Sequence, residues 1–215
     1  MPEPALTRRD PRRPPTGVVL MLHGGTQHSL EPVDGRSASW RRSRLMMSVL
    51  AGPANRAGVS MWLLRYRHRG WNDRVATPPS PVPDARWALD QVARELGPVP
   101  VVLLGHSMGA RTGVAVASHP RVTGVVALAP WLPADEPVEP LTGRHLAAAH
   151  GSADRITSLS QTEAFVRRAA SVAASTELRD MGAVGHYMLR RVREWNRFAL
   201  SRSLEFLGDA PRLGS

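Results

Sequence analysis

Short apolar runs that alternate with longer helical patterns most strongly limit how this chain can fold. Six runs have the length of strands and are bounded by turn residues, and the last is the least apolar. The runs are Val18–Leu22, Val59–Leu64, Val101–Leu104, Val122–Leu128, His145–Ala149 and Thr176–Met181. Runs that are apolar throughout are typical of parallel strands covered on both faces. The order therefore predicts an α/β fold with a mostly parallel sheet of about six to seven strands.

The segments between these runs have helical patterns. The predicted helices are Trp40–Ala57, Pro83–Leu96, a segment from just after Ser107 to about Ser118, Ser160–Ala174 and Met188–Leu207. Pro53 should end or kink the first of these near its last turn. The proline-rich stretches Pro78–Pro83 and Pro130–Pro140 are interpreted as loops. Together these features predict one domain over residues 1–215, with residues 1–15 irregular.

The formal charge of +10 would suit a polyanion-binding protein, but the residues behind it weaken that interpretation. All 28 basic residues are Arg, since Lys is absent, and Ile and Asn are rare; a GC-rich coding sequence explains this bias. The Arg residues cluster at Arg8–Arg13, Arg36–Arg44, Arg65–Arg69 and Arg190–Arg197, and no nucleic-acid-binding module is visible. We expect no nucleic-acid partner.

Two further absences narrow the chemistry and the location. The chain has no cysteine, which excludes disulfides and a thiol nucleophile. No apolar run approaches the length of about 20 residues that spans a bilayer, and none of signal-peptide type follows Arg8-Arg9. We expect a cytoplasmic protein without a membrane partner, a monomer or small homo-oligomer.

The most specific motif is Gly105-His106-Ser107-Met108-Gly109, which follows an apolar strand and opens a helix. In that context G-x-S-x-G indicates a nucleophile elbow, a tight turn that presents a serine from strained backbone. Side chains at positions 105 and 109 would collide with such a turn, so both must be glycine. The motif therefore predicts that Ser107 is a nucleophile at a helix N-terminus.

With this motif the sequence resembles the α/β-hydrolase family, from about residue 17 onward. Family members have a His-Gly segment after an early strand, then the elbow, an Asp and a His. Here His23-Gly24-Gly25 follows the first run, Asp154 follows the fifth, and His186 lies between the last run and the last helix. The resemblance implies an α/β-hydrolase fold and a catalytic triad.

The three residues would divide the work of acyl transfer. Ser107 would attack a carbonyl carbon while His186 accepts its proton, and Asp154 would hold the imidazole tautomer. The Met108 backbone N–H would stabilise the oxyanion, and the resemblance places the second donor on Gly25. No metal or cofactor is expected.

Other residues compete for two of these roles. Asp135 and Asp180 are rivals to Asp154, and Asp135 is the better one because some family members carry the acid after the preceding strand. The other histidines are poorly placed for a base: we interpret His106 and His150 as packing residues and His23 as ordering the oxyanion loop.

The loops indicate a small enzyme with an open site. Ala129–Arg144 is too short for the helical lid that many family members insert there, so no large cap domain is expected. Trp71 and Trp131 fall in predicted rim loops and could contact substrate or pack. Arg65, Arg67 and Arg69 could hold a carboxylate-bearing substrate, or form salt bridges or a solvated face.

The sequence thus predicts a serine hydrolase that cleaves small or medium carboxylic esters through an acyl-enzyme. The elbow also resembles that of type II thioesterases, although these carry a lid. A lactonase or C–C hydrolase would use the same triad. A non-catalytic binding protein on this scaffold would not need all three residues.

Overall fold

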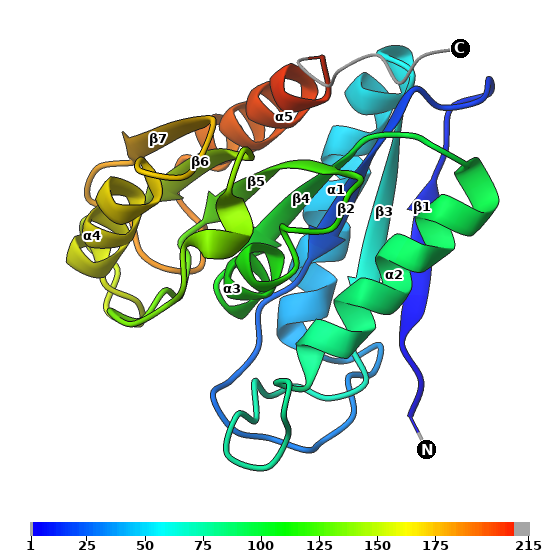
Figure 1. Ribbon diagram of the computed structural model, residues 1–215. Coiled ribbons are helices and arrows are strands. Elements are labelled where there is room, and N and C mark those ends of the chain that lie inside the picture. The colour runs from blue at the N-terminus through cyan, green and yellow to red at the C-terminus, as the bar shows by residue number, and fades with distance from the viewer. Residues whose placement is uncertain (1, 209–215) are drawn as a thin grey trace.

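Seven strands form one sheet in the computed structural model, which describes residues 2–208 (Figure 1). They are β1 (Ala5–Arg9), β2 (Gly17–Leu22), β3 (Val59–Arg65), β4 (Val101–His106), β5 (Val122–Leu128), β6 (His145–His150) and β7 (Ser175–Asp180). The spatial order is β1-β3-β2-β4-β5-β6-β7, and only β1 runs antiparallel to its neighbour. The predicted α/β class and mostly parallel sheet are confirmed.

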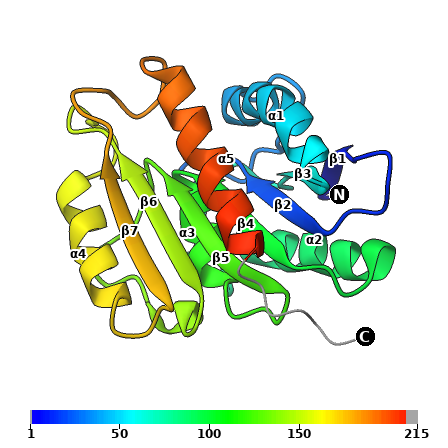
Figure 2. The same cartoon turned by 90° about the horizontal axis from the view of Figure 1, so that it is seen from above.

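Helices cover both faces of this sheet. They are α1 (Ala38–Arg56), α2 (Pro81–Leu96), α3 (Met108–Ala115), α4 (Leu159–Ala169) and α5 (Val192–Gly208), with a short 3-10 helix, η1 (Glu139–Leu141). In Figures 1 and 2, α1 and α5 lie on one face, and α2, α3 and α4 on the other. Strands β2 and β4 are buried along their whole length, as continuous apolar runs between two helix layers should be.

The prediction that residues 1–15 are irregular is wrong, because β1 adds an edge strand to the sheet. Leu6 pairs with Leu64, and the Arg8 guanidinium lies over the Trp62 ring at 4.3 Å from its centroid. Arg8 also forms a salt bridge with Glu95. These residues carry no apolar run of their own, so only their partners on β3 and α2 reveal the strand.

Two helix ends differ from the sequence-based ranges by four residues or more. Helix α5 begins at Val192 rather than Met188, because Met188 and Arg191 have positive φ angles of 54° and 55° that a right-handed helix excludes. Helix α4 ends at Ala169 rather than Ala174, and the chain then turns into β7. The segment before α5 is therefore a loop that can carry a side chain into a site.

The connection between β5 and β6 contains only a loop and η1, so the prediction that the fold has no large cap domain is confirmed. The edge of the sheet at the carboxyl ends of β2, β4 and β6 therefore has no inserted lid over it. Ligands bind at this edge in open α/β sheets. Among residues 2–208, no helix combines the length and apolar character that crossing a membrane requires.

Candidate active site

The turn between β4 and α3 holds Ser107 in strained backbone. Its φ of 55° and ψ of −119° lie outside the regions that side chains usually allow. A Cβ added at Gly105 would lie 2.4 Å from the Ala110 nitrogen, and one at Gly109 would lie 2.0 Å from the Leu22 carbonyl oxygen. The steric reason inferred for both glycines is therefore correct, and the turn has the form of a nucleophile elbow.

Two loops bring a histidine and a carboxylate to this serine. His186 Nε2 lies 3.1 Å from Ser107 Oγ, and His186 Nδ1 lies 2.8 Å from Asp154 Oδ2. Because a carboxylate can only accept, Nδ1–H donates to Asp154, and Nε2 accepts the Ser107 hydroxyl proton. All three side chains are nearly buried. The structure thus brings together the three predicted residues, while their catalytic roles remain a proposal.

The rival carboxylates lie elsewhere. Asp135 is exposed on the β5–β6 connection, and Asp180 at the end of β7 accepts a hydrogen bond from the Gly182 N–H at 2.7 Å. Among the carboxylates of residues 2–208, only that of Asp154 pairs with His186.

Hydrogen bonds keep Asp154 ionised. Burial alone would raise its pKa, but the N–H groups of Thr157 and Ile156 and the His186 ring donate to it and hold the pKa below its usual range. The Thr157 hydroxyl donates to Asp154 Oδ2 at 2.9 Å and lies 3.2 Å from His186 Nδ1. Sequence reasoning missed Thr157, whose only signal was its position three residues after an acid, a spacing typical of side chain-to-backbone turns.

Three more histidines pack around this arrangement, and burial lowers the pKa of each. Burial lowers the pKa of His106 to about 3 and that of His23 to about 4. His106 Nε2–H donates to the His186 carbonyl at 3.0 Å. His23 accepts from the Tyr66 N–H through Nε2 at 3.3 Å, so its Nδ1–H donates to the Gly24 carbonyl at 2.6 Å. His150 is fully buried, with Nε2 3.3 Å from Asp154 Oδ2. These positions agree with the packing and loop-ordering interpretations.

The two residues predicted as oxyanion donors, Met108 and Gly25, lie next to each other beside Ser107. The Met108 N–H opens α3, where helix N–H groups have no partner within the helix. Gly25 lies against Met108: a Cβ there would be 2.5 Å from Met108 Cε and 2.2 Å from the Arg69 carbonyl oxygen. Within residues 2–208, neither N–H donates to another backbone group. Position 25 therefore does not merely accept glycine but requires it.

Gly25→Ala should lower turnover by about 10²–10³-fold while the protein still folds, because the added methyl group must push the Gly25 N–H away from Ser107. Gly35→Ala is the matched control, since nothing lies within 4 Å of a Cβ there. The comparison uses kcat for one ester and the melting temperature of both variants. If Gly25→Ala kept full turnover, the Gly25 N–H would not be an oxyanion donor.

A cavity of about 330 Å³ opens beside Ser107 and His186. Its other lining residues are Gly24, Gly25, Thr26, Arg36, Ser37, Ala38, Ser39, Arg42, Arg69, His106, Ile156 and Tyr187. Trp71 and Trp131 do not line it, so the interpretation of them as substrate rim is corrected. Both rings pack on the Arg111 guanidinium, at 4.2 and 4.5 Å from their centroids, and Arg111 pairs with buried Glu136. They are loop-packing residues.

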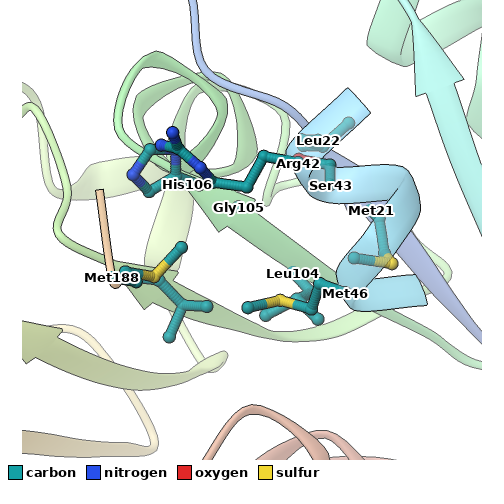
Figure 3. A pocket seen from close by; sticks show the side chains of 10 residues that line it. Met21, Leu22, Arg42, Ser43, Met46, Leu104, Gly105, His106 and Met188 are labelled. Atoms are coloured by element: carbon teal, nitrogen blue, oxygen red, sulfur yellow. The ribbon is translucent and has the colours of Figure 1, made fainter. Parts of the chain in front are cut away.

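A second cavity, of about 10 Å³, lies between α1 and the end of β4 (Figure 3). Its walls are largely methionine and leucine side chains, including Met21, Met46, Leu104 and Met188. That volume holds at most one water molecule. It therefore offers no tunnel for an acyl chain.

A nucleophile elbow on a parallel sheet, with His and Asp side chains delivered by loops after later strands, is the architecture of the α/β hydrolases. The sequence profile of the alpha/beta hydrolase family matches residues 19–212, and the chain belongs to this family. No curated protein sequence matches the chain.

Solved structures support the same fold at low sequence identity. An esterase from Thermogutta terrifontis with bound propionate is 19% identical, with 98% of this chain and 92% of that one covered and a TM-score of 0.71. A serine hydrolase without a lid from Xanthomonas campestris is 15% identical, with coverage of 97% and 91% and a TM-score of 0.65. Est1E from Butyrivibrio proteoclasticus, with ferulic acid bound, is 14% identical, with coverage of 95% and 96% and a TM-score of 0.68.

Proposed function

We propose that this protein is a serine hydrolase that cleaves carboxylic esters of small or medium acyl groups through an acyl-enzyme. The observation that carries the proposal is the continuous hydrogen-bonded chain from Ser107 Oγ through His186 to Asp154. Free N–H groups on Gly25 and Met108 beside the serine support it. A catalytic triad and an oxyanion site are the two features that acyl transfer needs.

Each group has one task in the proposed reaction. Ser107 Oγ attacks the ester carbonyl as its proton passes to His186 Nε2, and the Gly25 and Met108 N–H groups stabilise the oxyanion. The imidazolium, balanced by Asp154, returns the proton to the leaving alcohol. Water then attacks the acyl-enzyme by the same route, releasing the acid and restoring Ser107.

Thioesters and lactones would suit the same groups, and thioesterase activity remains the second candidate because of the elbow sequence Gly105–Ala110. A C–C hydrolase and a non-catalytic binding protein are weaker candidates. Comparing kcat/KM for an acyl ester and the matching acyl thioester separates the first two. The cytoplasmic location, the lack of a nucleic-acid or membrane partner and the monomeric or small oligomeric state stay predictions.

Acyl-chain preference follows from the shape of the site. The cavity is open, much of its wall is polar or charged, and the apolar cavity behind it is too small for an acyl chain. Each enclosed methylene would contribute about 0.8 kcal/mol, and an open polar groove realises only part of that. We therefore expect kcat/KM for p-nitrophenyl esters to peak at acyl chains of about two to six carbons.

The chain-length series is measured at substrate concentrations below micelle formation, with Ser107→Ala as the blank. A steady rise in kcat/KM through twelve carbons would require a deep apolar tunnel and would contradict the preference for short chains.

A further inference from the structure

Three arginines line the cavity beside Ser107 and His186. Arg36 directly precedes Ser37, the N-cap residue of α1, Arg42 is the fifth residue of α1, and Arg69 comes from the loop after β3. No Asp or Glu lies among the residues of the described chain that line this cavity. Within residues 2–208, this cavity is therefore lined by three basic residues and by no acidic one.

Internal salt bridges explain only part of this charge. Arg69 pairs with Glu31, at 2.6 Å between its guanidinium and the carboxylate, and its Nε is buried without a hydrogen-bond partner. Arg67, its near neighbour in sequence, pairs with Asp84 outside the cavity. Within residues 2–208, Arg36 and Arg42 form no salt bridge. Two guanidinium groups are thus left for an external anion.

The Arg42 side chain packs against a residue next to the predicted catalytic histidine. Its guanidinium carbon lies 4.6 Å from the centre of the Tyr187 ring, the residue after His186. Figure 3 shows the Arg42 side chain reaching from α1 toward His106. The side chain is half-buried, and burial lowers its pKa, so this cation has lost solvent without gaining an acidic partner. A bound anion would compensate that loss.

The first turn of α1 would also attract an anion in the cavity. Ser37, its N-cap residue, forms no side-chain cap, and the turn contains no acidic residue. The Ser37 hydroxyl donates instead to Asp34 at 3.1 Å. Ser37, Ala38 and Ser39 line the cavity, so the unpaired N–H groups and the positive end of the helix dipole lie at its wall. Asp34 is the acidic residue beside this end of α1: its carboxylate accepts hydrogen bonds from the Arg36 N–H and the Ser37 hydroxyl, and it does not line the cavity.

From these contacts we propose that the natural substrate is an ester that carries a carboxylate, which Arg42 and Arg36 bind while its carbonyl lies at Ser107. Guanidinium groups match the planar, two-oxygen geometry of a carboxylate. The proposal rests on the proposed esterase function and specifies its substrate class.

Matched ester pairs test it. p-Nitrophenyl hemiglutarate and p-nitrophenyl valerate differ by a carboxylate in place of a terminal methyl group on the acyl side. The butyrate esters of 4-hydroxybenzoate and 4-methylphenol place the same difference on the alcohol side. After correction for spontaneous hydrolysis, we expect kcat/KM to favour the anionic member of at least one pair by roughly tenfold or more. Raising the ionic strength should reduce that ratio.

Arginine variants test which residues cause the preference for anionic esters. Arg42→Gln and Arg36→Gln should each lower the anionic-to-neutral ratio by several-fold. Arg41→Gln, the exposed neighbour with the same charge on the same helix, should leave the ratio unchanged. If Arg42→Gln does not fold, inhibition of valerate-ester hydrolysis by glutarate, compared with the neutral glutaramide, measures the same site in the unaltered protein.

The outcomes distinguish a failure of the proposed substrate class from a failure of the proposed esterase function. Ratios near one in both pairs, with neutral esters still hydrolysed, overturn the substrate class and leave the esterase standing. A high ratio that Arg42→Gln and Arg36→Gln do not change overturns the assigned site. No hydrolysis of any ester by a folded protein overturns the proposed function itself.

Discussion

Ser107→Ala should lower ester turnover by about 10⁴–10⁶-fold, the loss typical of removing the nucleophile from a triad. The alanine retains the Cβ, so the strained turn and the surrounding helices should be unchanged, and the melting temperature should shift little. The measurement is kcat for p-nitrophenyl butyrate, with enzyme concentrations high enough to detect a rate near the spontaneous one.

Ser118→Ala is the matched control, because Ser118 is exposed after the end of α3 and contacts neither His186 nor the cavity. It should retain turnover within about twofold, as surface substitutions usually do. A Ser107→Ala variant that keeps a tenth of the activity would show that the proposed nucleophile is wrong.

Asp154→Asn should lower kcat by about 10³–10⁴-fold with little change in structure. The amide is similar in size and can still accept the Thr157 and Ile156 N–H groups. It no longer carries the charge that balances the imidazolium, and its NH₂ group can force His186 into the tautomer that cannot accept the Ser107 proton. Circular dichroism and the melting temperature establish that the variant is folded.

The rival acids supply the controls for this experiment. Asp135→Asn and Asp180→Asn should each retain kcat within about twofold, since neither carboxylate contacts His186. If Asp135→Asn lost most of its kcat while Asp154→Asn stayed active, the acid of the triad would be Asp135 in the β5–β6 connection and not Asp154.

The sequence predicts those parts of the site that depend on short motifs of neighbouring residues. The elbow combines an apolar strand with glycines whose missing side chains leave room for Leu22 and Ala110. The His-Gly segment, Asp154 and His186 each follow a strand, and parallel strands place their carboxyl ends at one edge. The order of elements, together with the resemblance to the α/β-hydrolase family, therefore predicted that these residues meet.

The parts that the sequence did not predict depend on partners far along the chain. Strand β1 exists because Arg8 and Leu6 meet β3, and its own residues carry no strand pattern. Trp71 and Trp131 pack on Arg111, whose position between them follows from the fold and not from either loop.

The arginines that line the cavity, Arg36, Arg42 and Arg69, also could not be grouped from the sequence. In the sequence, Arg36–Arg44 is one basic cluster among several, and Arg65, Arg67 and Arg69 occupy alternate positions, which in a strand would lie on one face. The strand ends at Arg65, so the alternation does not continue, and only Arg69 of those three reaches the cavity. The proximity of Arg42 to Ser107 required the packing of α1 beside the elbow, which no local pattern encodes.

The central claim is that Ser107 forms a covalent acyl-enzyme, and mapping the site of covalent labelling tests it most directly. The protein is treated with a fluorophosphonate, its intact mass is measured, and the modified peptide is sequenced by mass spectrometry. We expect one adduct per chain, on Ser107, and none in Ser107→Ala or in protein unfolded before treatment. An adduct on another serine, or no adduct on the folded protein, would contradict the claim.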